Sequence, residues 1–80
     1  MIDTHTQQPI RVETPERAPP EIQLSQDDVD RVRKLLEAHE VPHWVGHHAI
    51  SINGKPAVMW IHLRQRADPQ AVQELLDRTP

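Results

Sequence analysis

The stretch from residue 43 to residue 63 limits the possible folds of this chain more than any other segment. It contains both tryptophans and both glycines of the 80-residue sequence, and the tetrapeptide Asn-Gly-Lys-Pro at 53–56 separates two runs rich in β-branched and aromatic residues. An Asn-Gly pair between two such runs is typical of a β-hairpin turn. The sequence therefore predicts two antiparallel strands, over roughly residues 43–52 and 57–64.

Pro56 sets the expected register of this hairpin. A proline cannot donate a ladder hydrogen bond, so Ile52 is expected to face Ala57, and His47 then faces His62. Residues opposite each other share a sheet face, and a slip by one residue is the alternative register, which would exchange the two faces. In the first register the helices cover an apolar face made of Ile50, Ile52, Met59, Ile61 and Leu63, with Trp44. The other face carries His47, Ala49, Ser51, Val58, Trp60 and His62.

The segment before the hairpin has the pattern of an amphipathic helix. Ser25 is a candidate N-cap, and Asp28 stands three residues later, where a capping box has its acid. Pro42 disfavours helical geometry at the residue before it, so the helix should end near residue 39 or 40. The buried stripe recurs at three-to-four-residue spacing, at Val29, Val32, Leu35, Leu36 and His39.

A second helix is predicted after the hairpin, with Asp68 as its N-cap and Pro69 at its first helical position. Ile22 and Leu24 could add a short strand before the first helix. The predicted fold class is therefore α+β, a two-layer αββα unit around a central antiparallel hairpin with an optional N-terminal strand. This order resembles part of a ferredoxin-like split βαβ arrangement. Many functions share that topology, so it predicts no particular activity.

Residues 1–21 differ in composition from the rest of the chain. They hold four of the eight prolines and only isolated apolar residues. Such a segment buries too little apolar surface to offset the entropy cost of ordering it. The sequence therefore predicts an extended proline-rich N-terminal arm, residues 1–21, and a small α/β domain, residues 22–80.

Composition excludes several classes of function. The formal net charge is -3, which gives no basic footprint for a phosphate backbone, so nucleic acid is not an expected partner. No apolar run approaches the length of a membrane span, and the first residues lack the pattern of a signal peptide. We therefore expect a cytoplasmic protein without membrane insertion. The 36% hydrophobic content, with no Phe or Tyr, predicts a thin core for a domain of this size.

The histidines are candidate metal ligands, because imidazole is the side chain that most often binds metals. On one strand the Cα atoms of His43 and His47 would lie about 13 Å apart, too far to share an ion. The cross-strand pair His47 and His62 remains, and it has no evident third ligand. We therefore expect no cofactor and no metal. A histidine-based metal- or pH-responsive module that uses His47 and His62 is the alternative function.

The sequence contains no pattern that predicts catalysis. Ser51 lies in a predicted strand without a sharp elbow, cysteine is absent, and the two glycines form no phosphate-binding loop. Trp60 beside Val58 has the composition of an interface centre, where tryptophan is enriched. We therefore predict a non-enzymatic protein-binding module, an accessory subunit that contacts another protein or forms a homo-oligomer. The predicted binding residues, used together with the N-terminal arm, are His47, Ala49, Ser51, Val58, Trp60 and His62.

Overall fold

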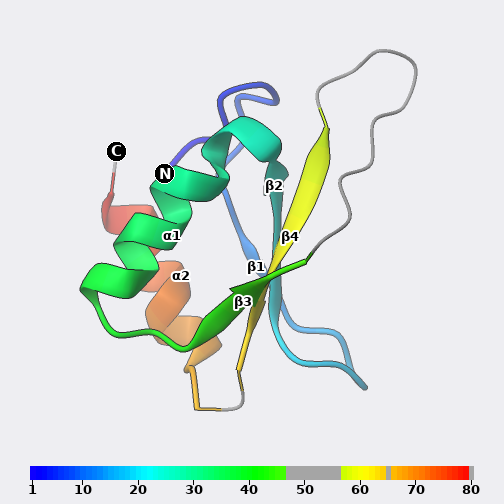
Figure 1. The fold of residues 1–80 in the computed structure, drawn as a ribbon, viewed down its shortest axis with the longest axis vertical. Helices are drawn as coiled ribbons and strands as arrows, with labels where there is room; N and C mark the ends of the chain where they lie inside the picture. Colours follow the sequence, from blue (N-terminus) through cyan, green and yellow to red (C-terminus); the bar gives the residue numbers. More distant parts are fainter. Residues whose placement is uncertain (47–56, 65, 80) are drawn as a thin grey trace.

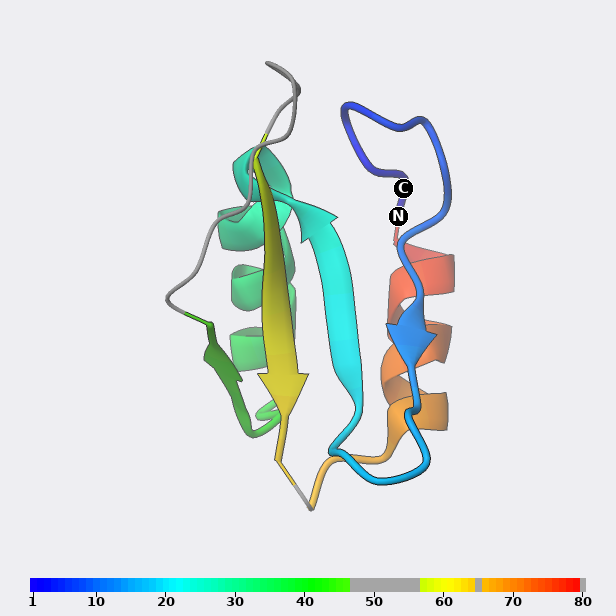
Figure 2. The ribbon, with the colours of Figure 1, turned by 90° about the vertical axis from the view of Figure 1, so that its right-hand side faces the viewer.

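A computed structural model describes residues 1–46, 57–64 and 66–79 of the chain. In these ranges a four-stranded antiparallel sheet forms one layer, and two helices cover one of its faces (Figures 1 and 2). The strand order is β1-β2-β4-β3. The strands are β1 (Val12–Glu13), β2 (Glu21–Ser25), β3 (His43–Val45) and β4 (Val58–Leu63). The predicted α+β class is confirmed, and the short strand predicted around Ile22 and Leu24 is β2.

The centre of the sheet is a split βαβ unit. β4 pairs antiparallel with both β2 and β3, so these two strands run parallel to each other with β4 between them. Helix α1 (Val29–Ala38) connects β2 to β3. The likeness to a ferredoxin-like arrangement goes no further than this unit and the helix that follows it, α2 (Pro69–Arg78).

The starts of the two helices differ in how well they were predicted. At α2, the Asp68 side chain accepts a hydrogen bond from the Gln70 N–H at 2.9 Å, and Pro69 is the first helical residue, as predicted. Before α1, a short 3-10 turn, η1 (Gln26–Asp28), follows Ser25, and neither Ser25 nor Asp28 caps through its side chain. The capping-box prediction is therefore wrong, because residues near the N-terminus bind these two side chains instead.

The core lies between the sheet and the two helices. Alternate residues of β2 and β4 point into it, and α1 and α2 add one apolar stripe each. The prediction that Ile61 and Leu63 point toward the helices is confirmed. The side chains with the least exposure at the centre of this core are Ile22, Val32, Leu36, Ile61, Leu63, Val72 and Leu76.

The observed register of β3 and β4 differs from the predicted one. His62 faces Trp44, three residues earlier in the chain than His47. Neighbouring residues of a strand point to opposite faces, so a shift of the pairing by three positions exchanges the faces. Trp44 therefore lies on the face that carries His62, and not on the apolar face where it was predicted. The register is set by the core, since Val45 opposite Ile61 packs against the buried cluster. The predicted pairing of His62 with His47 is therefore wrong.

Residues 1–13 pack against the rest of the domain. Met1 and Ile10 are buried in the common core, and Val12 pairs with Ile22 in the sheet. The amino group of Met1 donates a hydrogen bond to the carbonyl oxygen of Leu76 in α2. An arm was predicted here because the segment has few apolar residues. Hydrogen bonds to buried carboxylates also hold the segment, and composition does not indicate them. The predicted boundary after residue 21 falls inside β2.

Candidate functional site

One face of the sheet is not covered by either helix (Figures 1 and 2). Its side chains alternate along the strands with those that enter the core. We call this surface the open face. It is formed by Glu13, Glu21, Gln23, Trp44, Val58, Trp60 and His62.

The strand register places one row of side chains across all four strands. Glu13 is opposite Glu21, Glu21 is opposite His62, and His62 is opposite Trp44. The His62 ring stacks on the Trp44 ring, with centroids 4.1 Å apart and an interplanar angle of 19°. Its Nδ1 lies 3.7 Å from Oε2 of Glu21. The imidazole is thus held between a carboxylate and an indole, and Trp44 remains 45% exposed.

A second row contains the other tryptophan. Trp60 is opposite Gln23 of β2, and on its other side the Gly46 N–H donates to the Trp60 carbonyl oxygen at 2.9 Å. A Cβ at Gly46 would lie 3.5 Å from Nε2 of His62. This is an ordinary van der Waals distance, so Gly46 lies directly beside the His62 ring. Both tryptophans of the chain therefore lie on the open face.

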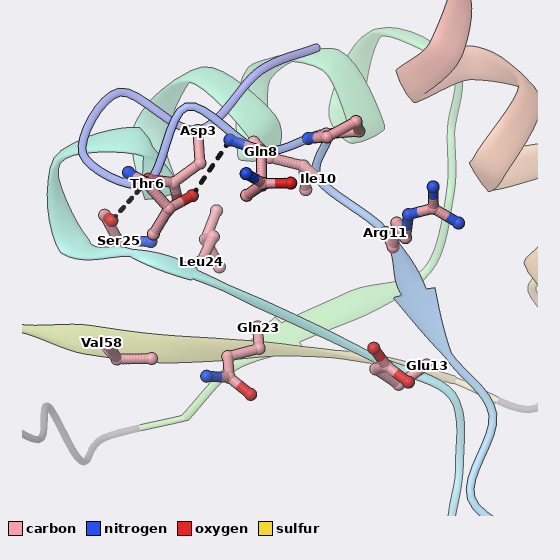
Figure 3. Close-up of a pocket in the computed structure, with 11 residues that line it drawn as sticks. Asp3, Thr6, Gln8, Ile10, Arg11, Glu13, Gln23, Leu24, Ser25 and Val58 are labelled. Atoms are coloured by element: carbon pink, nitrogen blue, oxygen red, sulfur yellow. Dashed lines mark hydrogen bonds between the residues drawn. The ribbon is translucent and has the colours of Figure 1, made fainter.

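The open face is bordered by two hollows. One, of about 300 Å³, lies between the N-terminal residues and β2, and Glu13, Gln23 and Val58 of the open face line it (Figure 3). The other, of about 430 Å³, is lined by Trp44 together with Arg64 and other residues beyond the end of β4. The two hollows thus adjoin the open face at Glu13, Gln23 and Val58 and at Trp44.

Asp3 is a buried acid that lines the hollow beside β2, and its role is structural. Burial by itself would raise the pKa of its carboxyl, but the backbone N–H groups of Thr6, Ser25 and His5 and the Ser25 hydroxyl all donate to it and hold the pKa at about 2. Figure 3 shows this carboxylate directed at Ser25. A carboxylate with so low a pKa is a poor proton acceptor near neutral pH.

Asp28, the other buried acid, is also fully engaged. Its carboxylate accepts from the Thr4 N–H at 2.8 Å, from the Thr4 hydroxyl, and from Arg31 at 2.9 Å. These bonds tie the N-terminal residues to the start of α1. Every carboxylate oxygen of Asp3 and Asp28 accepts a hydrogen bond, so both acids hold the N-terminal segment in place.

The predicted binding residues divide into two groups. The structure places Val58, Trp60 and His62 on the open face. His47, Ala49 and Ser51 lie outside the described residues.

The structure adds four residues to this surface that sequence reasoning missed. The alternation of β2 could have indicated Glu21 and Gln23, and the correct register would have indicated Trp44. Glu13 lies in a segment whose composition gives no signal for a strand, so it could not have been found.

Within residues 1–46, 57–64 and 66–79, no three His, Asp or Glu side chains are grouped so that they could hold a metal ion. His62, one half of the predicted histidine pair, contacts Glu21 and Trp44. Over the same ranges, neither helix has the length and apolar character to cross a membrane.

Comparison with known proteins does not identify the site. No protein-family model matches the sequence, and no curated protein or solved structure matches it significantly.

Proposed function

We propose that this chain is a non-enzymatic protein-binding domain, a cytoplasmic accessory subunit that docks onto another protein through its open face. One observation carries the proposal: both tryptophans lie on that face, and Trp44 is 45% exposed. Tryptophan is the side chain most enriched among the residues that dominate binding energy at interfaces. The aromatic centre of the open face therefore has the character of a docking surface.

The distribution of aromatic residues supports this proposal. The chain has two Trp and no Phe or Tyr, and neither Trp belongs to the buried core. Aromatic side chains bury more area than any others and usually contribute strongly to a core. Trp44 is 45% exposed, so a molecule that covers this face would bury aromatic area that folding leaves in contact with water.

The contacts of the buried acids and of His62 support a function without catalysis. Asp3 and Asp28 are the buried acids of the described residues, and their oxygens accept hydrogen bonds from the segment that they hold. His62, the imidazole at the centre of the open face, is stacked on Trp44. The hydroxyls of Ser25 and Thr4 donate to these carboxylates and not to an imidazole, so these groups do not form the nucleophile and base pair that acyl transfer needs.

In the proposed docking the N-terminal segment acts as part of the folded domain and not as a free arm. Through β1 it supplies Glu13 to the open face, and through its first ten residues it supplies one wall of the hollow beside β2. A partner that covers the open face would therefore contact this segment at the same time as β4.

A capture experiment with two matched variants tests the proposal. Ile2 and Trp44 are the large hydrophobic residues exposed in the described chain, at 43% and 45%. Ile2 lies near α1, where its carbonyl oxygen binds Arg31, so Ile2→Ala is a control for Trp44→Ala. Affinity purification from the native host should recover the same partner with the wild type and Ile2→Ala, and at least several-fold less with Trp44→Ala. Equal recovery with all three chains would contradict the proposal.

A further inference from the structure

Residues 1–13 occupy a site that the rest of the domain forms. Met1 and Ile10 are buried in the core, and β1 pairs with β2. Asp3 accepts hydrogen bonds from the end of β2, and Gln73 of α2 binds the backbone of β1. Every copy of the chain carries the same segment, so the site fits residues 1–13 of a second copy as well as it fits its own.

The loop that joins this segment to β2 favours an extended conformation. It consists of residues 14–20, and three of these seven residues are prolines, at positions 15, 19 and 20. Proline fixes its own φ and disfavours helical geometry at the residue before it. Proline-rich segments therefore adopt the polyproline II conformation, which rises about 3.1 Å per residue.

The fold of a single copy requires the opposite of this loop. Glu13 and Glu21, at its two ends, face each other in the ladder, so their Cα atoms lie about 5 Å apart. In the polyproline II conformation the same part of the chain would span about 25 Å. The chain reverses at residues 16–18, and residues 14–19 are exposed at one end of the sheet (Figure 2). Closing the loop within one copy therefore opposes its local preference.

We propose that two copies of this chain exchange residues 1–13. In the dimer each segment occupies the site of the other copy, and residues 14–19 extend between the two domains. Pro20 keeps its place, because its carbonyl oxygen accepts from the Leu63 N–H at 2.8 Å. The exchange retains every contact of the segment and replaces the reversed loop by an extended one.

The exchange also changes the composition of the open face. Glu13 lies on that face, and residues 3–11 contribute one wall of the hollow beside β2. In the dimer both come from the other copy, so each open face is built from two chains. This inference concerns the assembly of the protein and does not rest on the proposed docking.

Two single-cysteine variants detect the exchange, because the chain has no cysteine of its own. E13C and E21C place their thiols opposite each other in the ladder, at a Cα separation that a disulfide bridges. The two variants are mixed in urea, refolded at millimolar concentration, diluted to micromolar and oxidised. A non-reducing gel should show several-fold more covalent heterodimer than the same mixture refolded at micromolar concentration, because association follows mass action.

Two controls identify the origin of the disulfide. Either variant refolded alone should give almost no covalent dimer, because the exchange then places its cysteine opposite a glutamate. The double variant E13C/E21C, refolded at micromolar concentration, should form a disulfide within one chain. That result shows that the two thiols react when the segment occupies its site.

Proline replacements test the role of the loop. P15A/P19A, introduced into both cysteine variants, should lower the yield of heterodimer several-fold, because alanine permits the reversed loop at no conformational cost. E16A/R17A is the matched control. It changes two residues of the same loop, keeps all three prolines and the net charge, and should leave the yield unchanged.

The outcomes that contradict the proposal are distinct. Absence of heterodimer at millimolar concentration, with the double variant oxidised within one chain, would overturn the exchange. Equal amounts of covalent dimer from the mixture and from the single variants would indicate contact between closed copies, which also overturns it. A yield unchanged by P15A/P19A would overturn the role of the prolines. The capture experiment with Trp44→Ala tests the proposed function separately from all of these results.

Discussion

At the scale of single residues, the carboxylate of Asp3 is the strongest organiser of the N-terminal segment. It accepts hydrogen bonds from Ser25 through both the backbone N–H, at 2.9 Å, and the hydroxyl, at 2.7 Å, so it joins residues 22 positions apart. The same carboxylate orders its own turn by accepting from His5 and Thr6. One ionised group therefore makes several of the contacts that hold a segment poor in apolar residues.

The low pKa of Asp3 makes the stability of the chain depend on pH. Its folded pKa is about 2, below the value near 3.9 of an unfolded chain, so its contribution is complete above about pH 4 and is lost as the pH falls toward 2. That contribution corresponds to about 2 kcal/mol. Urea denaturation should show Asp3→Asn destabilised by this amount at pH 7 and by much less at pH 2.

The exposed acid Asp30 provides the matched control for this measurement, since its one ion pair, with Arg33, is long at 3.9 Å. Asp30→Asn should leave the pH dependence of stability unchanged. If Asp3→Asn were equally destabilising at both pH values, or had no effect, the ionised state of Asp3 would not hold the N-terminal segment.

At the scale of secondary-structure elements, a side chain of α2 protects one edge of the sheet. The outer edge of β1 is covered by a side chain of α2. Oε1 of Gln73 accepts from the Val12 N–H at 2.8 Å, and its Nε2 donates to the Ile10 carbonyl at 3.3 Å. The amide of Gln73 thus binds the edge as another strand would, which keeps β1 from pairing with a further chain.

Removing this amide should loosen β1. Gln73→Ala leaves the N–H of Val12 and the carbonyl of Ile10 without their partner, at a cost of about 1–2 kcal/mol in the free energy of unfolding. Gln70→Ala, on the exposed side of the same helix, should cost nothing measurable. Chemical denaturation of both variants checks this. Equal stability of the two would mean that the amide contributes nothing to holding β1.

Sequence reasoning succeeded for elements whose signals are local. Asp68 and Pro69 define the start of α2, and Pro42 accounts for the end of α1. It failed where long-range contacts decide. β1 depends on Gln73, which is 61 positions from Val12, and the register of β3 depends on core packing. The same register error placed Trp44 on the covered face and so hid part of the candidate site.

At the scale of the whole molecule, the domain has a small aliphatic core and an aromatic exterior face. The buried hydrophobic side chains are aliphatic, and the two tryptophans lie on the other side of the sheet. A domain of this size has little stability to spare. On this face Trp44 is exposed and Trp60 is partly buried.

The contribution of Trp44 to folding can be measured directly. Trp44→Ala should lower the free energy of unfolding by no more than about 1 kcal/mol, since the side chain is half exposed and loses mainly its stacking on His62. Leu36→Ala, at a site with 0% exposure, should cost about 2–5 kcal/mol. Urea denaturation of both variants provides the comparison. If Trp44→Ala were as damaging as Leu36→Ala, Trp44 would be a folding residue.

The central claim is that the open face contacts a partner while the helical layer does not. Photo-crosslinking in the native host tests it most directly, with the photoreactive residue placed either at Gln23, on the open face, or at Glu74, exposed on α2. We expect a single covalent adduct with another protein from position 23 and none from position 74. An adduct only from position 74, or none from either position, would contradict the claim.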